Sequence, residues 1–388
     1  MCSLMKLLST NRQFVKKRLS FSAICVGGML LLGACHPTAS NTAGVSVEKM
    51  EGFPSADTCF VKGVSALYAG VCDGQLIMAG GCNFPHVPVA DGGKKVYYDG
   101  IYAASLTEDA TLQWQEIGLL PEASAYGVTI PTAKGLVCVG GNTATRSLSE
   151  VLMLSLQNGG AVMDTLPSLP VTIDNMAGAL LENTIYIVGG NVNGVPSSSV
   201  YSLQLDNLAE GWKEEVSVPG NPRVQPVCAA QGGKLYVWGG FSTAGEGREA
   251  TLSVDGYAYT PATKEWKPVA TPTDETGTAV SLGGGVALPL GEDAILCAGG
   301  VNKDIFLQAL QGIHKGKEYL TRPVEWYQFN RKLLKYDIQK DQWTVLGDYE
   351  QGARAGAAMV SDGSSYYIIN GELKPGIRTK DINRIKFK

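Results

Sequence analysis

The sequence predicts an all-β fold that is built from six repeats of short strands. Six apolar runs recur along the chain, and each ends in Gly-Gly or Asn-Gly. The first residue of that pair lies at 80, 140, 189, 239, 299 and 370. The composition agrees with this fold class, because 388 residues include 48 glycines and only 18% charged residues. Such a chain is typical of short strands and tight turns rather than of long charged helices.

Every repeat has the same order of strand and turn signals. The apolar run, for example 76–79, is expected to be a strand that is buried on both faces, and a turn signal such as Asp73-Gly74 precedes it. Another small and apolar run, for example 125–130, lies before that turn. A third strand and often a fourth strand with a tryptophan follow the glycines. The tryptophans in question are Trp114, Trp212, Trp266 and Trp343.

This pattern resembles the Kelch repeat of β-propellers, in which four antiparallel strands form one blade. The resemblance implies a six-bladed β-propeller over residues 45–388. The last repeat has only three strands, at 353–361, 364–371 and 379–387, whereas residues 45–50 alternate apolar and polar side chains. We therefore expect the N-terminal strand to close the last blade and to cover its exposed edge. An irregular β-sandwich with glycine turns is the alternative architecture.

Residues 1–34 have the pattern of a secretory signal peptide. Basic residues precede an apolar stretch, 19–33, that is short for a membrane span. The sequence LGAC at 32–35 resembles a bacterial lipobox, which implies cleavage before Cys35 and acylation of its thiol. His36 stands where an aspartate retains enteric lipoproteins at the inner membrane. We therefore expect a periplasmic protein, lipid-anchored in the outer membrane of a Gram-negative bacterium; an ordinary signal peptide with a chance cysteine is the alternative.

Removal of this segment makes the chain more acidic. Residues 1–34 hold five lysines and arginines and no acidic residue, so the formal net charge changes from −4 to −9. An acidic protein is a poor candidate for nucleic-acid binding. Residues 35–44 are expected to be a flexible tether from the lipidated Cys35, so that membrane contact occurs only through the anchor.

Histidine and cysteine usage argues against a dedicated metal site. The three histidines, at 36, 86 and 314, are scattered, and no CxxC motif occurs. The cysteines after the lipobox lie at 59, 72, 82, 138, 228 and 297. The last three lie in apolar runs and are expected to be core residues. An oxidising compartment permits the pairs Cys59–Cys72 and Cys72–Cys82, and the sequence does not decide between them.

The longest predicted loops follow the glycine pairs, which places them on one face of the repeats. Residues 82–96 and 301–330 form two such loops, and loops of this length are commonly functional. The loop after residue 371 carries Glu372 and Arg378, which no other repeat has.

Residues 370–379, NGELKPGIRT, resemble the NGExKPGxRT motif of the bacterial N-acetylneuraminate epimerases, also called sialic acid mutarotases. Residues 299–306 and 222–225 resemble the same family, and the similarity extends over 45–388. In enteric members the motif lies mid-chain, so the resemblance implies a circularly permuted order of repeats. The family's RAYG is SAYG at 124–127 here, which leaves the role of that region open.

The resemblance implies conversion of the α anomer of sialic acid (N-acetylneuraminate), which sialidases release, into the β anomer. It thereby implies a functional link to a sialidase and a sialic acid transporter. The family's catalytic pair corresponds to Glu372 and Arg378. Anomer exchange requires ring opening at C2, for which Glu372 is the candidate base, while Arg378 is expected to bind the substrate carboxylate. This chemistry needs no cofactor.

Three further residues are candidates for substrate binding. Arg223 is a candidate second anion-binding group, and Tyr126 and Asn302 are expected to line the same funnel. The alternatives are a solvated arginine, a packed aromatic residue and a turn-forming asparagine. The basic and aromatic stretch 94–98 is interpreted as a solvated loop with core-facing tyrosines.

The alternative function for the whole chain is a non-catalytic Kelch propeller that binds sialoglycans or a protein partner. Such a module would use Arg378 but would have no use for a base at Glu372. A surface salt bridge is the structural alternative for this pair of residues.

Overall fold

The computed structural model describes residues 44–314 and 316–388. The predicted signal peptide, Cys35 and all but the last residue of the predicted tether lie outside the described residues. Within the described residues, no helix combines the length and the hydrophobicity that a membrane crossing requires. Strands dominate and helices are few and short, which confirms the predicted all-β class.

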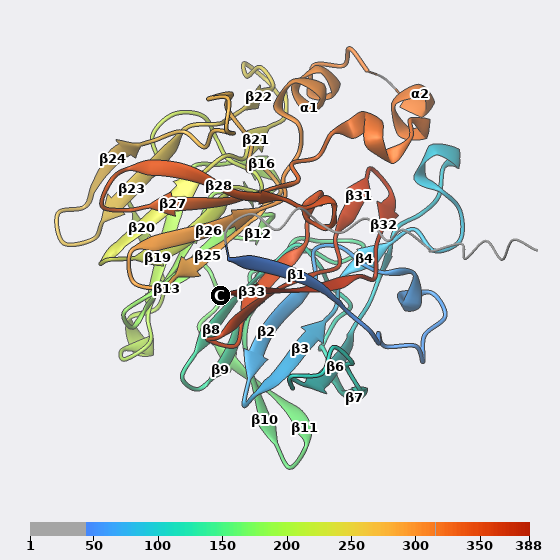
Figure 1. Cartoon of the computed structure of the whole chain (residues 1–388). Coiled ribbons are helices and arrows are strands. Elements are labelled where there is room, and N and C mark those ends of the chain that lie inside the picture. The colour runs from blue at the N-terminus through green and yellow to red at the C-terminus, as the bar shows by residue number, and fades with distance from the viewer. Residues whose placement is uncertain (1–43, 315) are drawn as a thin grey trace, which may run out of the picture. The chain divides into compact units, whose positions relative to one another are not determined.

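The described residues form six four-stranded antiparallel sheets (Figure 1). Each predicted apolar run supplies the second strand of one sheet. Numbered along the chain, the sheets contain β2 (Tyr68–Cys72), β3 (Gln75–Ala79), β6 (Gly100–Ser105) and β7 (Trp114–Leu119) in sheet 1; β8 (Val128–Thr132), β9 (Gly135–Val139), β10 (Val151–Gln157) and β11 (Gly160–Leu166) in sheet 2; β13 (Ala177–Leu181), β14 (Thr184–Val188), β17 (Val200–Gln204) and β18 (Lys213–Glu215) in sheet 3; β19 (Val227–Gln231), β20 (Lys234–Trp238), β23 (Gly256–Thr260) and β24 (Glu265–Val269) in sheet 4; β25 (Val286–Leu290), β26 (Ala294–Ala298), β27 (Lys332–Asp337) and β28 (Gln342–Asp348) in sheet 5; and β29 (Ala358–Ser361), β30 (Ser365–Ile369), β33 (Ile382–Phe387) and β1 (Val45–Met50) in sheet 6.

The remaining elements are short and lie mostly between the second and third strands of the sheets. The long segment 301–330 is expected to be a loop, but it contains two α-helices. These shorter elements are β4 (Cys82–Asn83), β5 (Val96–Tyr97), β12 (Ile173–Asp174), β15 (Asn191–Val192), β16 (Val195–Pro196), β21 (Phe241–Ser242), β22 (Thr251–Leu252), β31 (Glu372–Lys374), β32 (Ile377–Arg378), α1 (Lys303–Leu310), α2 (Gly316–Thr321) and the 3-10 helices η1 (Phe60–Lys62), η2 (Val89–Asp91), η3 (Leu208–Glu210), η4 (Val324–Tyr327) and η5 (Glu350–Gly352).

Sheet 6 joins strands from opposite ends of the described chain. The strand predicted at residues 45–50 is present as β1 and pairs with β33 along its whole length, from Val45 opposite Phe387 to Met50 opposite Ile382. Figure 1 shows the blue β1 directly beside the red β33. The side chain of Lys49 reaches across this pairing to Asp381 at 2.9 Å. The N-terminal strand is therefore held by main-chain and side-chain bonds to the segment that follows the motif.

The packing between sheets follows one repeated scheme. The first strand of each sheet contacts the first strand of the next, and β29 of sheet 6 contacts β2 of sheet 1. Six buried apolar clusters fill the spaces between successive sheets. One of them contains Met78 of sheet 1 together with Tyr367 of sheet 6. The series of contacts between the sheets thus returns to its starting point.

A closed circuit of backbone hydrogen bonds links the six sheets just before their first strands. At this position each sheet has one residue whose N–H donates to the carbonyl of its counterpart in the preceding sheet, over 2.7 to 2.9 Å. Ala66 of sheet 1 donates to Gly356 of sheet 6, which completes the circuit. Every one of these residues has a left-handed φ between 51° and 74°. They are Ala66, Tyr126, Asn175, Gln225, Gly284 and Gly356.

Candidate functional site

The motif at 370–378 folds into a small two-stranded hairpin that lies between β30 and β33 of sheet 6 along the chain. Its two strands, β31 and β32, place Glu372 opposite Arg378. Arg378 Nη1 donates to Glu372 Oε1 over 2.9 Å, and the N–H of Gly376 donates to the same oxygen over 2.6 Å. Gly376 has a φ of 85° in the turn, a conformation that favours glycine. Both bonds end on Oε1, so the hairpin fixes the carboxylate, and within residues 44–314 and 316–388 no hydrogen bond to Oε2 is formed.

The Arg378 side chain is only 3% exposed, whereas the Glu372 side chain is 24% exposed. Arg378 Nε donates to Ser65 Oγ over 3.0 Å, and its guanidinium lies 5.2 Å from the centre of the Phe84 ring. Burial lowers the pKa of Arg378, but Glu372 and Tyr126 outweigh burial and raise it overall. Arg378 is therefore a fixed cation, held by the bonds of Nε to Ser65 and of Nη1 to Glu372.

Arg354 holds the two ends of the segment that carries this pair. Its Nη1 donates to the carbonyl of Asn370 over 3.1 Å and to the carbonyl of Asp381 over 2.9 Å. The side chain is buried, and burial lowers the pKa of its guanidinium to about 10. The neighbouring Ala355 exchanges two backbone hydrogen bonds with Glu372. The sequence did not point to Arg354, which bonds the backbone on both sides of the hairpin and not the Glu372 carboxylate.

Tyr126 is linked to the surroundings of the pair, because its N–H donates to the carbonyl of Ala66, the neighbour of the Ser65 that Arg378 contacts. The Tyr126 hydroxyl accepts a hydrogen bond from Lys95 Nζ over 2.9 Å, and Lys95 Nζ lies 4.5 Å from the centre of its ring. Burial raises the pKa of the Tyr126 hydroxyl well above 10, with further contributions from Cys82 and Glu372 that Arg378 opposes. The predicted solvated loop at 94–98 therefore sends one of its lysines to the site.

Asn302 lies beside a separate cavity. Its side chain caps helix α1 by accepting hydrogen bonds from the N–H groups of Asp304 and Ile305, which is the turn-forming alternative. The cavity has a volume of about 510 Å³ and meets the motif at Leu373, and neither Glu372 nor Arg378 lines it. Asn302 thus lines a cavity that reaches the hairpin at Leu373, whereas Glu372 and Arg378 lie outside that cavity.

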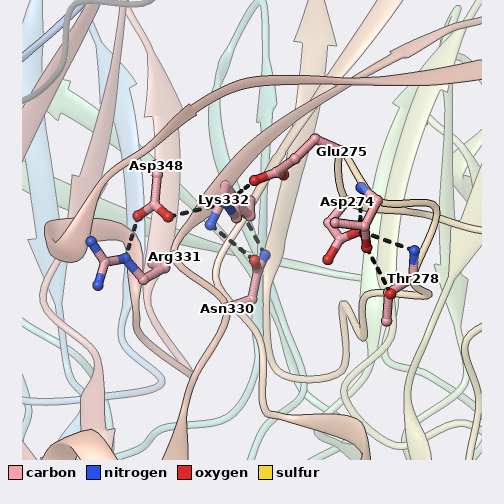
Figure 2. A network of polar contacts seen from close by, with 8 residues as sticks. Asp274, Glu275, Thr278, Asn330, Arg331, Lys332 and Asp348 are labelled. Carbon is pink, nitrogen blue, oxygen red and sulfur yellow. Dashed lines mark hydrogen bonds and ion pairs between the residues drawn. The ribbon is translucent and has the colours of Figure 1, made fainter.

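The polar wall of this cavity is largely saturated with internal bonds (Figure 2). Lys332 Nζ lies 2.6 Å from Glu275 and 3.1 Å from Asp348. Arg331 also pairs with Asp348. Because these cations already have carboxylate partners, the wall offers less free charge to an anionic ligand than Arg378 does.

Two long loops, 82–96 and 301–330, meet beside the hairpin. Helix α2 contacts η2, and Lys317 forms an ion pair of 2.6 Å with Asp91 across the two loops. Lys374 of the hairpin donates to a backbone carbonyl of the second loop over 2.5 Å. Both loops are thus tied to each other and to the motif, on the face of the sheets that the sequence predicted to be functional.

Arg223 does not join the site. Its side chain is 0% exposed, and both terminal nitrogens are bonded: Nη1 donates to the carbonyl of Gly239, and Nη2 lies 3.0 Å from both carboxylate oxygens of Asp255. This arrangement repeats that of Arg354, because each arginine bonds the carbonyl of the residue 16 positions later. Burial contradicts the solvated alternative, and both terminal nitrogens of this predicted second anion-binding group are already bonded within the chain.

This arrangement predicts a structural role for the Arg223–Asp255 pair. We expect Asp255→Asn to lower the free energy of unfolding by about 2 kcal/mol, because a buried guanidinium loses its charged partner. The matched control is Glu210→Ala, which removes an exposed ion pair with Lys213 and should change stability by less than about 1 kcal/mol. Urea unfolding measures both; equal effects would contradict a structural role for the bond between the buried Arg223 and the partly exposed Asp255.

The cysteines of the described residues form no disulfide. All six cysteines of the described residues are free, so neither of the two pairings left open by the sequence is formed. Cys138, Cys228 and Cys297 are buried, as expected for core residues. Among the described residues, no group of three histidine, cysteine or acidic side chains is arranged to hold a metal ion.

In chemical terms, the site presents one carboxylate with a free oxygen, one buried guanidinium, one phenol and one ammonium group. A carboxylate and a phenol can exchange protons with a bound molecule, while the guanidinium favours an anionic ligand. Glu372, Arg378 and Tyr126 are thus brought together from the predicted set, and Lys95, Ser65 and Phe84 complete their surroundings.

Comparisons with known proteins point to one family. A family model described as N-acetylneuraminate epimerase matches residues 166–388. Proteins named N-acetylneuraminate epimerase from Haemophilus influenzae (strain 86-028NP) and Yersinia enterocolitica serotype O:8 / biotype 1B are 34% identical over 236 residues and 35% identical over 228 residues. These matches cover 58% and 55% of this chain, and 60% and 55% of the relatives, so this chain spans somewhat over half of their length. A solved structure described as "Structure of YjhT" is 30% identical, covers 57% of this chain and 65% of that chain, and has a TM-score of 0.49.

Proposed function

Because this chain belongs to the N-acetylneuraminate epimerase family, we propose that it converts the α anomer of sialic acid into the β anomer. The observation that carries this proposal is the fixed carboxylate of Glu372, whose Oε1 is held by Arg378 and Gly376 and whose Oε2 is left for a substrate. A module that only binds sialoglycans would gain nothing from an oriented base. We therefore favour the enzyme over the binding module.

The reaction opens and recloses the sugar ring at C2. Glu372 Oε2 takes the proton of the anomeric hydroxyl while the bond between C2 and the ring oxygen breaks and the ring oxygen gains a proton. Rotation about the C2–C3 bond then presents the other face of the carbonyl, and the ring closes with the proton transfers reversed. The residues supply a base and an anion site, and this chemistry needs no cofactor.

Arg378 is proposed to hold the substrate carboxylate. A bidentate pair would need Nη1, which Glu372 already occupies, so we propose that Nη2 makes the bond to the substrate. The buried position of the guanidinium strengthens such a charge-assisted bond. The carboxylate at C2 would then lie next to the base that acts on the hydroxyl at the same carbon.

The decisive experiment is NMR of anomer exchange. A sialidase releases the α anomer in the spectrometer, and the appearance of the β anomer is followed with and without the purified protein. We expect the protein to accelerate the exchange above the spontaneous rate. Binding of sialic acid without any acceleration would favour the non-catalytic alternative.

For Arg378→Ala we expect the Kd for sialic acid to rise by about 10- to 100-fold, which corresponds to the loss of one hydrogen bond to a charged group. Isothermal titration calorimetry measures the change. Arg146→Ala is the control, since this arginine is 46% exposed and pairs with Glu122 and Glu150 on the surface. An unchanged Kd in the Arg378 variant would remove this residue from substrate binding.

We also propose that the six sheets are the blades of a closed Kelch-type β-propeller over residues 45–388. The circuit of six backbone hydrogen bonds, the contact of β29 with β2 and the pairing of β1 with β33 support this architecture. A circularly permuted order of blades would interrupt any collinear alignment. That expectation agrees with matches that cover 55% to 60% of the relatives.

We propose that residues 1–34 are a lipoprotein signal peptide and that Cys35, followed by the tether at 35–44, anchors the protein in the outer membrane. The protein would then meet sialic acid in the periplasm, between a sialidase that releases it and a transporter that takes it up. The lipobox and the acidic remainder of the chain support this proposal. Labelled palmitate should enter the wild type but not a Cys35→Ala variant, and an unlabelled wild type would refute the anchor.

A further inference from the structure

Lys95 is directed at the hydroxyl of Tyr126 rather than at solvent. Its Nζ donates to Tyr126 Oη over 2.9 Å and lies 4.5 Å from the centre of that ring, while the Tyr97 ring lies at 5.8 Å. The ammonium group has no lone pair, so the phenol oxygen is the acceptor in this bond. The bond from Lys95 therefore uses a lone pair of the phenol and leaves the hydroxyl proton on Tyr126.

The backbone fixes the position of Tyr126. Its φ of 62° is strained for a non-glycine residue, and two bonds of the backbone circuit hold it: its N–H donates to Ala66, and its carbonyl accepts from Asn175. The same left-handed conformation recurs at the five other positions of the circuit, so it belongs to the framework of the fold. The phenol thus belongs to the rigid framework, whereas Lys95 comes from the long loop at 82–96.

The phenol is also placed against the base and the anion site. Arg378 bonds Glu372 over 2.9 Å and Ser65 over 3.0 Å, and the carbonyl of the next residue, Ala66, accepts the N–H of Tyr126 over 2.9 Å. In agreement with this placement, Glu372 contributes to the raised pKa of Tyr126. Burial is the largest cause of the raised pKa of Tyr126, which keeps the hydroxyl protonated at neutral pH. A protonated phenol can act as an acid where the carboxylate of Glu372 acts as a base.

We propose that Tyr126 is the acid that protonates the ring oxygen of the sugar, and that Lys95 is the positioning residue that stabilises the resulting phenolate. This inference rests on the proposed mutarotase function and assigns the second half of its proton transfer. The ammonium of Lys95, 2.9 Å from Oη, supplies the positive charge that a developing phenolate needs.

The proton balance closes over one cycle. In ring opening, Glu372 gains the proton of the anomeric hydroxyl, the bond between C2 and the ring oxygen breaks, and Tyr126 gives its proton to that oxygen. The products are the open-chain keto acid, a protonated Glu372 and a Tyr126 phenolate paired with Lys95. In reclosure on the other face, the chain hydroxyl returns its proton to Tyr126, and Glu372 returns its proton to the new anomeric oxygen.

The test combines three variants with two readouts. Tyr126→Phe removes only the hydroxyl and should lower kcat by about 100-fold, within the range of general acid catalysis. Lys95→Met should lower kcat by about 10-fold or more, and Lys95→Arg should recover part of that loss because it restores the positive charge. Lys94→Met is the matched control, because Lys94 is an exposed neighbour in the same loop, and should leave kcat unchanged. The Kd of the methyl α-glycoside of sialic acid, which cannot open its ring, should be the same in every variant.

The outcomes separate this inference from the proposed function. A wild type that does not accelerate exchange would refute the mutarotase itself. An active wild type together with full kcat in Tyr126→Phe would refute only the role of Tyr126. Equal losses in kcat and in glycoside binding would reduce the phenol to a binding group and would also overturn the proposal. If Tyr126→Phe fails to fold, the Lys95→Met and Lys95→Arg pair decides, since equal kcat in both and in the wild type contradicts it.

Discussion

Glu372→Gln is expected to lower kcat for anomer exchange by about 100- to 10,000-fold while leaving the Kd for sialic acid nearly unchanged. The amide retains an oxygen at the position of Oε1, so Arg378 and the N–H of Gly376 keep their acceptor. At the position of Oε2, an NH₂ group replaces the oxygen that takes the proton. The substitution therefore removes the base without dismantling the hairpin.

NMR of anomer exchange gives kcat for this variant, and calorimetry gives its Kd. Glu246→Gln is the matched control, because Glu246 is an exposed carboxylate between the second and third strands of sheet 4. It should behave as the wild type. If Glu372→Gln keeps full activity, the carboxylate is not the base, and a role as a structural salt bridge with Arg378 becomes the better account.

Met50→Asp is expected to lower the free energy of unfolding by about 4 kcal/mol or more, since it removes a core side chain and buries a carboxylate in its place. Met50 is 2% exposed, lies opposite Ile382 and packs in the cluster between sheets 6 and 1. We also expect a lower kcat at temperatures where the variant is still folded. The reason is that Lys49 of β1 pairs with Asp381, and the carbonyl of Asp381 accepts a hydrogen bond from Arg354, which also bonds the backbone at the start of the hairpin.

Met50→Leu is the control for this second prediction, because it conserves side-chain volume and should lower stability by less than about 1.5 kcal/mol. Chemical denaturation measures the stability of both variants, and anomer exchange is measured below the unfolding transition. A Met50→Asp protein with wild-type stability would contradict the closure of sheet 6 by β1. Reduced stability with unchanged kcat in the folded state would instead show that the pairing of β1 with β33 does not affect the site.

The strands of this fold are predictable because glycine restricts where they can end. The six second strands end at the positions predicted from Gly-Gly and Asn-Gly, since a left-handed backbone is required there and few other residues adopt it readily. In sheet 6 this position is Asn370, with a φ of 54°, which asparagine tolerates better than most residues. The helices in 301–330 escaped prediction because a short helix depends on its cap, and Asn302 was interpreted as a ligand group.

The site was predictable only where its residues are neighbours in the sequence. Glu372 and Arg378 lie six positions apart in one hairpin, so one motif contained both. Lys95 and Tyr126 come from different sheets and meet through tertiary structure, which no local pattern encodes. For Arg223 the sequence did contain a repeated pattern that predicts a structural role. Arg223 precedes Gly239 by 16 residues, and Arg354 precedes Asn370 by the same number. That recurrence was the available signal for a structural role.

The pairing of β1 with β33 in sheet 6 also limits the order in which the sheets can form during synthesis. Sheets 1 to 5 are each made from contiguous sequence, so each can form soon after its last strand has been synthesised. Sheet 6 must wait, because Glu48 of β1 and its partner Arg384 are 336 residues apart. During that time β1 remains an unpaired strand near the N-terminus, exposed to wrong partners and to chaperones. Sheet 6, whose strands β30 and β33 flank the hairpin of Glu372 and Arg378 along the chain, is therefore completed last, and the proposed activity would arise only when β1 has paired with β33.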